Sequence, residues 1–204
     1  GYNALSANTT GYWNTAIGWN AMVNNTTGGE NVALGQASLD ANTTGNSNVA
    51  LGSYALSSNT TANINTGIGV GALRDNTTGS GNASVGALAL LLNTTGTNNT
   101  ALGYSAGDAM TTGSNNLLLG KSADASSASA SNQIVVGASA VGHGDNIAVI
   151  GNTDMTAWHP ADDNGVDLGS SSYEFKDLYV DGVAYVDGLD LNGTAVSATA
   201  AELN

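Results

Sequence analysis

The residue types that most often carry out chemistry are scarce in this chain and widely spaced. Five carboxylates occur in residues 1–144, each in a different part of the sequence: Glu30, Asp40, Asp75, Asp108 and Asp124. The chain has no Cys, and its two His residues, His143 and His159, do not form a metal-spaced pair. General acid–base and nucleophilic catalysis need such groups side by side. We therefore expect no enzymatic activity and no cofactor.

Two metal sites are compatible with the sequence, but neither is predicted. A threefold assembly would gather three copies of His159 around one axis. The aspartates near the carboxy end offer oxygen ligands of the kind that Ca²⁺ prefers: Asp162, Asp163, Asp167, Asp177, Asp181, Asp187 and Asp190. Their spacing matches no calcium-binding loop. We expect the His and Asp side chains to be solvated in turns.

The tripeptide Asn-Thr-Thr recurs at a constant interval of seventeen residues. Its copies begin at residues 8, 25, 42, 59, 76 and 93. Each copy is also an N-glycosylation sequon, which matters only in a eukaryotic secretory pathway. A fixed period of this kind predicts a repeat architecture.

Glycine marks the start of each repeat unit. It occupies residues 1, 18, 35, 52, 69, 86, 103 and 120, and Gly137 opens a ninth unit of fourteen residues. The units follow the pattern G-x-x-A-L-x-x-N-T-T-G-x-x-N-x-A-L, in which positions are counted from the glycine. Position fourteen is Asn until the eighth unit, where it is Gln133.

Seventeen residues are too few for a pair of helices with turns. They fit one coil made of two short strands and two turns. The Asn-Thr-Thr-Gly segment is then a turn, in which copies about 4.8 Å apart can form hydrogen-bonded ladders. The sequence therefore predicts an all-β protein with a parallel β-solenoid of nine coils over residues 1–151.

Apolar residues on both faces of the predicted strands indicate an oligomer. Successive strand residues point to opposite faces, yet position sixteen (mostly Ala) and position seventeen are both apolar, as are positions four and five. A thin coil can bury only one face of each strand, so we expect another chain to cover the other. Core or interchain contacts are expected at position seventeen, although which face points into the coil stays open: Ile17, Leu34, Leu51, Ile68, Val85, Leu102, Leu119 and Val136.

The composition excludes two classes of partner. Lys and Arg total three in 204 residues, and the net charge is −13, so no basic patch for nucleic acid can form. No run of eighteen apolar residues exists, so we predict no membrane insertion. Three aromatic residues near the amino end, Tyr12, Trp13 and Trp19, are candidate contacts for a cell-surface glycan or another partner.

The segments N-T-A-I-G (14–18), N-V-A-L-G (31–35 and 48–52) and N-T-A-L-G (99–103) resemble the head repeats of trimeric autotransporter adhesins, the YadA-like head. The resemblance covers residues 1 to about 151. It implies a left-handed parallel β-roll assembled as a homotrimer. The units of this chain are longer than is usual in that family, and we expect the additional residues to enlarge the Asn-Thr-Thr-Gly turn.

The last quarter of the chain resembles bacteriophage tail-fibre proteins. The resemblance rests on residues 163–182, which contain L-G-S-S-S-Y-E-F-K-D-L-Y, and on the ending V-S-A-T-A-A-E-L-N (196–204). The composition of residues 152–204, with Asp-Gly pairs between short apolar runs, predicts a neck and an intertwined β-rich shaft. Thr199-Ala-Ala-Glu202 matches a capping box, which indicates a helix that begins there. The chain is expected to continue beyond both ends.

The two resemblances together predict a structural role outside the cell. We expect a virion segment that extends and positions a host-recognition tip, with other fibre or baseplate proteins as partners, and with host-surface glycan as a further partner of the roll. The alternative is the head of a bacterial trimeric autotransporter adhesin that binds a host surface or matrix.

Overall fold

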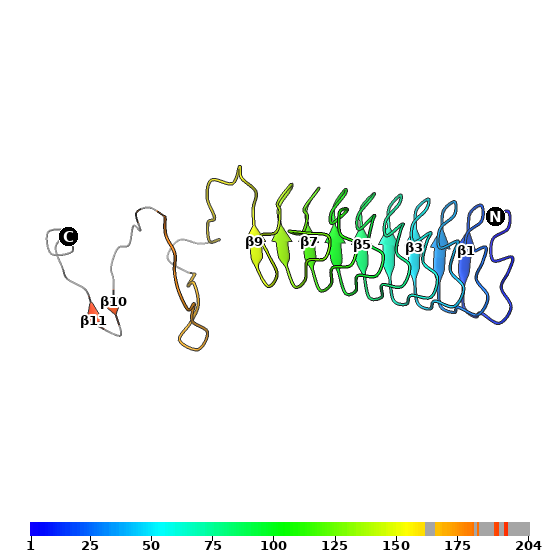
Figure 1. The fold of residues 1–204 in the computed structure, drawn as a ribbon, viewed down its shortest axis with the longest axis horizontal. Helices are drawn as coiled ribbons and strands as arrows, with labels where there is room; N and C mark the ends of the chain where they lie inside the picture. The colour runs from blue at the N-terminus through cyan, green and yellow to red at the C-terminus, as the bar shows by residue number, and fades with distance from the viewer. Residues whose placement is uncertain (162–165, 182, 184–189, 192–193, 196–204) are drawn as a thin grey trace. The chain divides into compact units, whose positions relative to one another are not determined.

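The structure is a computed structural model that describes residues 1–161, 166–181, 183, 190–191 and 194–195. The chain divides into two compact units, Gly1–Ala157 and Trp158–Asn204. The first unit contains the repeats and forms a β-solenoid, which we call the roll (Figure 1). The sequence placed the end of the repeats at residue 151, one residue after the last strand of the roll ends.

One three-residue strand per repeat builds the roll. The strands are β1 (Thr15–Ile17), β2 (Val32–Leu34), β3 (Val49–Leu51), β4 (Thr66–Ile68), β5 (Ala83–Val85), β6 (Thr100–Leu102), β7 (Leu117–Leu119), β8 (Ile134–Val136) and β9 (Ala148–Ile150). They form one parallel sheet in chain order. Paired residues such as Thr15 and Val32 are seventeen apart, and the interval falls to fourteen between β8 and β9. The predicted all-β parallel solenoid is confirmed.

The expectation of two strands per coil was wrong, because the Ala-Leu pair at positions four and five lies in a turn. Leu39 has φ 53° and Leu56 has the same value, which is the left-handed conformation and incompatible with a strand. This conformation also removes the alternation of faces that we expected. Ala55 and Leu56 are both fully buried, so positions four and five both point into the coil.

Burial repays this unfavourable backbone conformation. A non-glycine residue in the left-handed region costs about 1–2 kcal/mol, whereas full burial of a leucine side chain contributes about 1.5–3 kcal/mol. The fully buried side chains at position five run through the roll: Met22, Leu39, Leu56, Leu73 and Leu90. They form the centre of the core together with the small residues at positions four and sixteen.

The predicted hydrogen-bonded ladders are present, and the Asn side chains that form them are buried. At position eight, each Nδ2 donates to the Oδ1 of the copy seventeen residues earlier at 2.7–3.0 Å, and to a carbonyl three residues later: Asn25, Asn42, Asn59, Asn76 and Asn93. At position fourteen, each Oδ1 accepts the backbone N–H of the next copy at 2.9–3.1 Å, from Asn14 through Asn116. These ladders satisfy most of the buried Asn side chains, as buried polar groups generally require; the Oδ1 of Asn93, at the end of the position-eight ladder, has no partner.

Threonine and glycine each have a recurring structural role in the coils. The Thr9 hydroxyl donates to the carbonyl of Thr26, and each later copy repeats this bond one coil further on. A Cβ at Gly18 would overlap the carbonyl of Gly35, and φ of Gly18 is 142°. The first position of each coil is therefore glycine because neighbouring backbones approach too closely for any side chain.

The pattern changes in the seventh and eighth coils, where the core is rearranged. Gly107 replaces the leucine of position five, and Leu118 replaces the alanine of position sixteen. A Cβ on Gly107 would lie 2.5 Å from Cδ1 of Leu118, so the larger side chain fills the space that the glycine vacates. The ladder of position eight stops where Met110 takes the place of Asn. The other ladder ends at Gln133, whose side chain exchanges hydrogen bonds with Ser126.

The second unit contains little regular structure in its described part. The β10 (Asp190–Leu191) and β11 (Thr194–Ala195) strands pair antiparallel, and Ser170 pairs with Tyr173 around a turn that follows Gly169. Its large apolar side chains between residues 158 and 183 are exposed in the single chain. The helix expected near residue 199 lies outside the described residues. So do Asp162, Asp163 and Asp187 of the suggested calcium ligands.

Candidate functional surface

The outer face of the nine-stranded sheet is the largest repetitive surface feature of the roll. Burial along the strands alternates, so position sixteen points into the coil, where Ala33 and Ala50 are fully buried. Position seventeen points outward, which answers the question that the sequence left open. The outward side chains are 37–56% exposed in six strands: Ile17, Leu34, Ile68, Val85, Leu102 and Leu119. Leu51 and Val136 are half-buried at the same position.

Position fifteen adds to the same face, because it also points outward. Val32, Val49 and Leu117 are half-buried there, and Ile134 is exposed. From position thirteen to position two of the next unit, the first eight coils contain only two charged residues, Glu30 and Lys121. We call this strip, positions thirteen to two over β1–β9, the sheet face. It carries few charges, and its aliphatic side chains at position seventeen recur in every coil.

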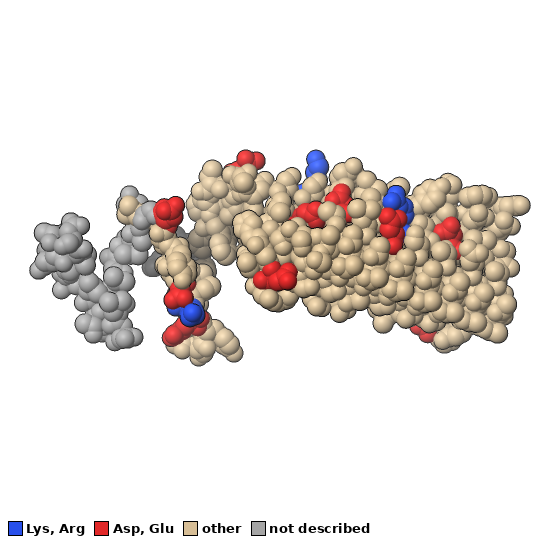
Figure 2. Space-filling view, in the orientation of Figure 1, with Lys and Arg blue, Asp and Glu red and all other residues tan. Residues whose placement is uncertain are grey.

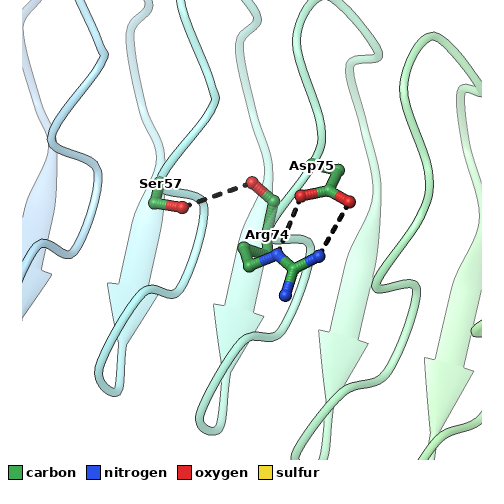
Figure 3. A network of polar contacts seen from close by, with 3 residues as sticks. All are labelled: Ser57, Arg74 and Asp75. Carbon is green, nitrogen blue, oxygen red and sulfur yellow. Dashed lines mark hydrogen bonds and ion pairs between the residues drawn. The ribbon is translucent and has the colours of Figure 1, made fainter.

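Most other charges of the roll lie at positions five to seven, away from the sheet face: Asp40, Arg74, Asp75, Asp108 and Asp124. Figure 2 shows how few charged side chains interrupt the visible surface of the roll. Arg74 donates to both carboxylate oxygens of Asp75 at 2.8 and 3.0 Å, and the Ser57 hydroxyl donates to the carbonyl of Arg74 in the next coil (Figure 3). This exposed ion pair between adjacent residues stabilises the protein little.

Two carboxylates of this region, Asp40 and Asp124, have raised pKa values because the roll partly covers them. Burial raises the pKa of Asp40, although its own N–H and that of Ala41 donate to the carboxylate and oppose the shift. Burial also raises the pKa of Asp124, and the negative charge of Asp108 adds to this effect. Asp40 belongs to the third coil and Asp124 to the eighth, so the structure does not bring them together as a catalytic pair.

One motif associated with catalysis was overlooked by the sequence reasoning. Gly103-Tyr104-Ser105-Ala106-Gly107 fits the G-x-S-x-G pattern that surrounds the nucleophilic serine of many hydrolases. Ser105 has φ 52°, but it is only 8% exposed, and its N–H donates to the carbonyl of Ala87 as position three does in other coils. The motif here arises from the repeat pattern and from the glycine that accommodates Leu118.

The described residues contain no cluster of metal-ligating side chains. Within that part of the chain, no group of three or more His, Asp or Glu side chains is arranged to hold a metal ion. His143 is exposed in the ninth coil, and His159 is exposed in the second unit, which follows the roll. No helix of the described structure is long and apolar enough to cross a membrane.

The three aromatic residues singled out from the sequence are exposed. The rings of Tyr12 and Trp13 meet edge to face with centroids 5.3 Å apart, and the Tyr12 ring lies over Gly29 of the second coil. Trp13 is 80% exposed, and Trp19 is exposed at position two. The ring of Trp19 does not stack on Tyr12 or Trp13.

The backbone at position thirteen is left-handed in every full coil of the roll. The free-energy cost of this conformation depends on the residue type. Asn98, Asn115 and Gly81 adopt this conformation easily. Trp13 (φ 52°) and Ile64 (φ 59°) do not, and Ile64 is 69% exposed although a β-branched residue is a rare outlier there. Unlike Leu39 and its equivalents, these two side chains gain no burial within the chain in return for the strain.

No family model, no curated protein and no solved structure matches the chain.

Proposed function

We propose that the chain is a structural segment of a bacteriophage tail fibre, assembled as a homotrimer, which extends and positions a host-recognition tip. The single observation that supports this most is the sheet face, on which outward aliphatic side chains recur over nine coils and which carries two charged residues in its first eight coils. Monomeric proteins rarely expose a contiguous apolar surface of this extent. Self-association around one axis covers it without leaving an open end for further growth.

The size of the sheet face agrees with a stable interchain contact. Nine parallel strands at about 4.8 Å extend about 38 Å along the roll. Covering the remaining exposed half of one outward aliphatic side chain in each coil contributes about 7–13 kcal/mol, which is comparable to the stability of a domain.

We propose a trimer with left-handed coils because the repeats resemble YadA-like heads. We propose a tail fibre because residues 163–182 and 196–204 resemble phage fibre proteins. The second unit supports an interchain shaft, because it offers no core of its own for its described apolar side chains: Trp158, Val166, Leu168, Tyr173, Phe175, Leu178, Tyr179, Val180 and Val183. Other fibre or baseplate proteins are the expected partners.

An autotransporter adhesin head remains the alternative, because the roll alone is compatible with both settings. A second activity, adhesion of the roll to host-surface glycan, is supported by the exposed Tyr12–Trp13 pair, whose amphipathic rings suit sugar contacts. An antibody raised against the roll separates the two settings. Labelling of fibres on phage particles supports the proposal. Labelling of the bacterial envelope in uninfected cells would instead identify the chain as an adhesin head.

Assembly is tested by two substitutions on opposite sides of equivalent strands. Leu34→Asp places a charge on the sheet face and is expected to leave a folded chain that sediments as a monomer. Ala50→Asp places a charge in the fully buried core and is expected to prevent folding of the roll. Circular dichroism reports folding, and sedimentation velocity reports assembly. A folded monomer of the unmodified chain at micromolar concentration would refute the trimer.

A further inference from the structure

The sheet face repeats so regularly that it leaves the axial alignment of neighbouring chains weakly determined. Every coil presents an aliphatic side chain at position seventeen, and coils are stacked at about 4.8 Å. Displacing one chain by a single coil replaces Leu34 with Leu51 or Ile17 opposite the same partner atoms. Such a shift loses only about one ninth of the contact, because eight of nine coils remain paired. Regular strands of this kind are prone to slippage.

Positions two, thirteen and fifteen of the sheet face differ between coils, and position thirteen is the one of these three whose backbone is left-handed in every full coil. Backbone hydrogen bonds hold these residues in one column, for example from Ile64 N–H to the carbonyl of Asn46 in the coil before. The column contains Trp13, Glu30, Ser47, Ile64, Gly81, Asn98, Asn115 and Asn132. Only Trp13 and Ile64 are large and apolar, and they stand three coils apart.

Trp13 and Ile64 are also unfavourable for the stability of the single chain. The left-handed backbone at this position favours Asn and Gly, which other coils have, and both side chains are more than two-thirds exposed. Backbone strain that the fold does not require is typical of functional contacts. Trp13 at least contacts the Tyr12 ring, but Ile64, in the middle of the roll, has no such aromatic partner.

We infer that Trp13 and Ile64 fix the axial register of the homotrimer, as the two large apolar side chains that position thirteen presents to a neighbouring chain. This inference rests on the proposed function, because it takes the sheet face to be the interchain contact. Around a threefold axis, unlike patches of neighbouring chains meet. Each of these two side chains therefore fits a single recess on the neighbour, and a shift of one coil brings it against a different residue.

Photo-crosslinking of the full chain measures the register directly. A benzoylphenylalanine replaces Thr100, which is exposed at position fifteen. Unlabelled and ¹⁵N-labelled chains are mixed before assembly, so that mass spectrometry identifies crosslinks between chains and the coil that each one reaches. The test variant carries Trp13→Asn and Ile64→Asn, because asparagine suits the backbone there. The matched control is Leu92→Asn, which removes an exposed apolar side chain at position seven, outside the sheet face.

The expected result is a single level of crosslinks in the unmodified chain and in the Leu92→Asn control. The double variant is expected to remain trimeric by sedimentation and to add crosslinks displaced by seventeen residues, each displaced set at one-tenth or more of the native intensity. A trimeric double variant with a single level would overturn the inference and leave the proposed function intact, as would several levels in the unmodified chain. An unmodified chain that sediments as a folded monomer would overturn both.

Discussion

The interrupted Asn ladder allows one substitution to be compared at two positions with different hydrogen-bond environments. In the middle of the ladder, the Asn59 Oδ1 accepts from Asn76 Nδ2 at 2.9 Å, while the Asn59 Nδ2 donates to Asn42 Oδ1 at 3.0 Å. At the end of the ladder, Asn93 donates to Asn76 Oδ1 in the same way, but its own buried Oδ1 has no donor, because Met110 follows it. Asn59→Leu and Asn93→Leu therefore remove the same donor but different acceptors.

The magnitude of the difference follows from the cost of an unpaired buried group, about 1–3 kcal/mol. Both substitutions leave the Oδ1 of the preceding Asn without its donor. Asn59→Leu also leaves one N–H of Asn76 unpaired, whereas Asn93→Leu removes an acceptor that was already unpaired. We expect Asn59→Leu to be the more destabilising of the two, by about 1–3 kcal/mol, the cost of the additional unpaired N–H of Asn76.

Guanidinium denaturation at one fixed chain concentration is the assay, because assembly makes the apparent stability depend on concentration. The two variants share the substituted residue type and full burial, so differences in the hydrophobicity of the new side chain cancel. Equal destabilisation, or a larger effect of Asn93→Leu, would show that the position-eight ladder does not stabilise the roll in the way described.

Three further changes test other parts of the fold. Gly107→Leu is expected to destabilise the roll by about 1–3 kcal/mol through overlap with Leu118; adding Leu118→Ala should restore most of the loss in a double-mutant cycle, and purely additive losses would contradict the packing argument. Since burial raises the pKa of Asp40 and Asp124, the folded state holds their protons more tightly than the unfolded state. Stability should thus rise as pH falls from neutral toward about 4; Asp40→Asn should raise thermal stability at neutral pH and weaken this dependence, and an unchanged melting temperature would argue against it. Ser139→Gly relaxes an exposed left-handed residue (φ 56°) and should stabilise by up to about 1 kcal/mol by denaturation, whereas Ser129→Gly, at a residue without positive φ, should not.

Several features of the roll were determined by the sequence alone, because each repeat must satisfy the same local geometry. The seventeen-residue interval predicted the parallel stacking of β1–β9, and the recurring Asn-Thr-Thr predicted the ladder of position eight; the ladder of position fourteen emerged only from the structure. Glycine at position one was recognisable as a unit boundary. These predictions depend only on residue type and spacing.

The tertiary structure decided what one chain buries and what it leaves exposed. The Ala-Leu pair has the composition of a strand, and only the left-handed backbone at Leu39 and its equivalents turns both side chains inward. That backbone is unfavourable locally and is adopted because the closed coil buries the leucine, a gain that local propensity does not contain. The same closure directs Ala50 inward and Leu51 outward. It also made Leu118 a partner of Gly107, eleven residues away in sequence, since that contact exists only once the coil has formed.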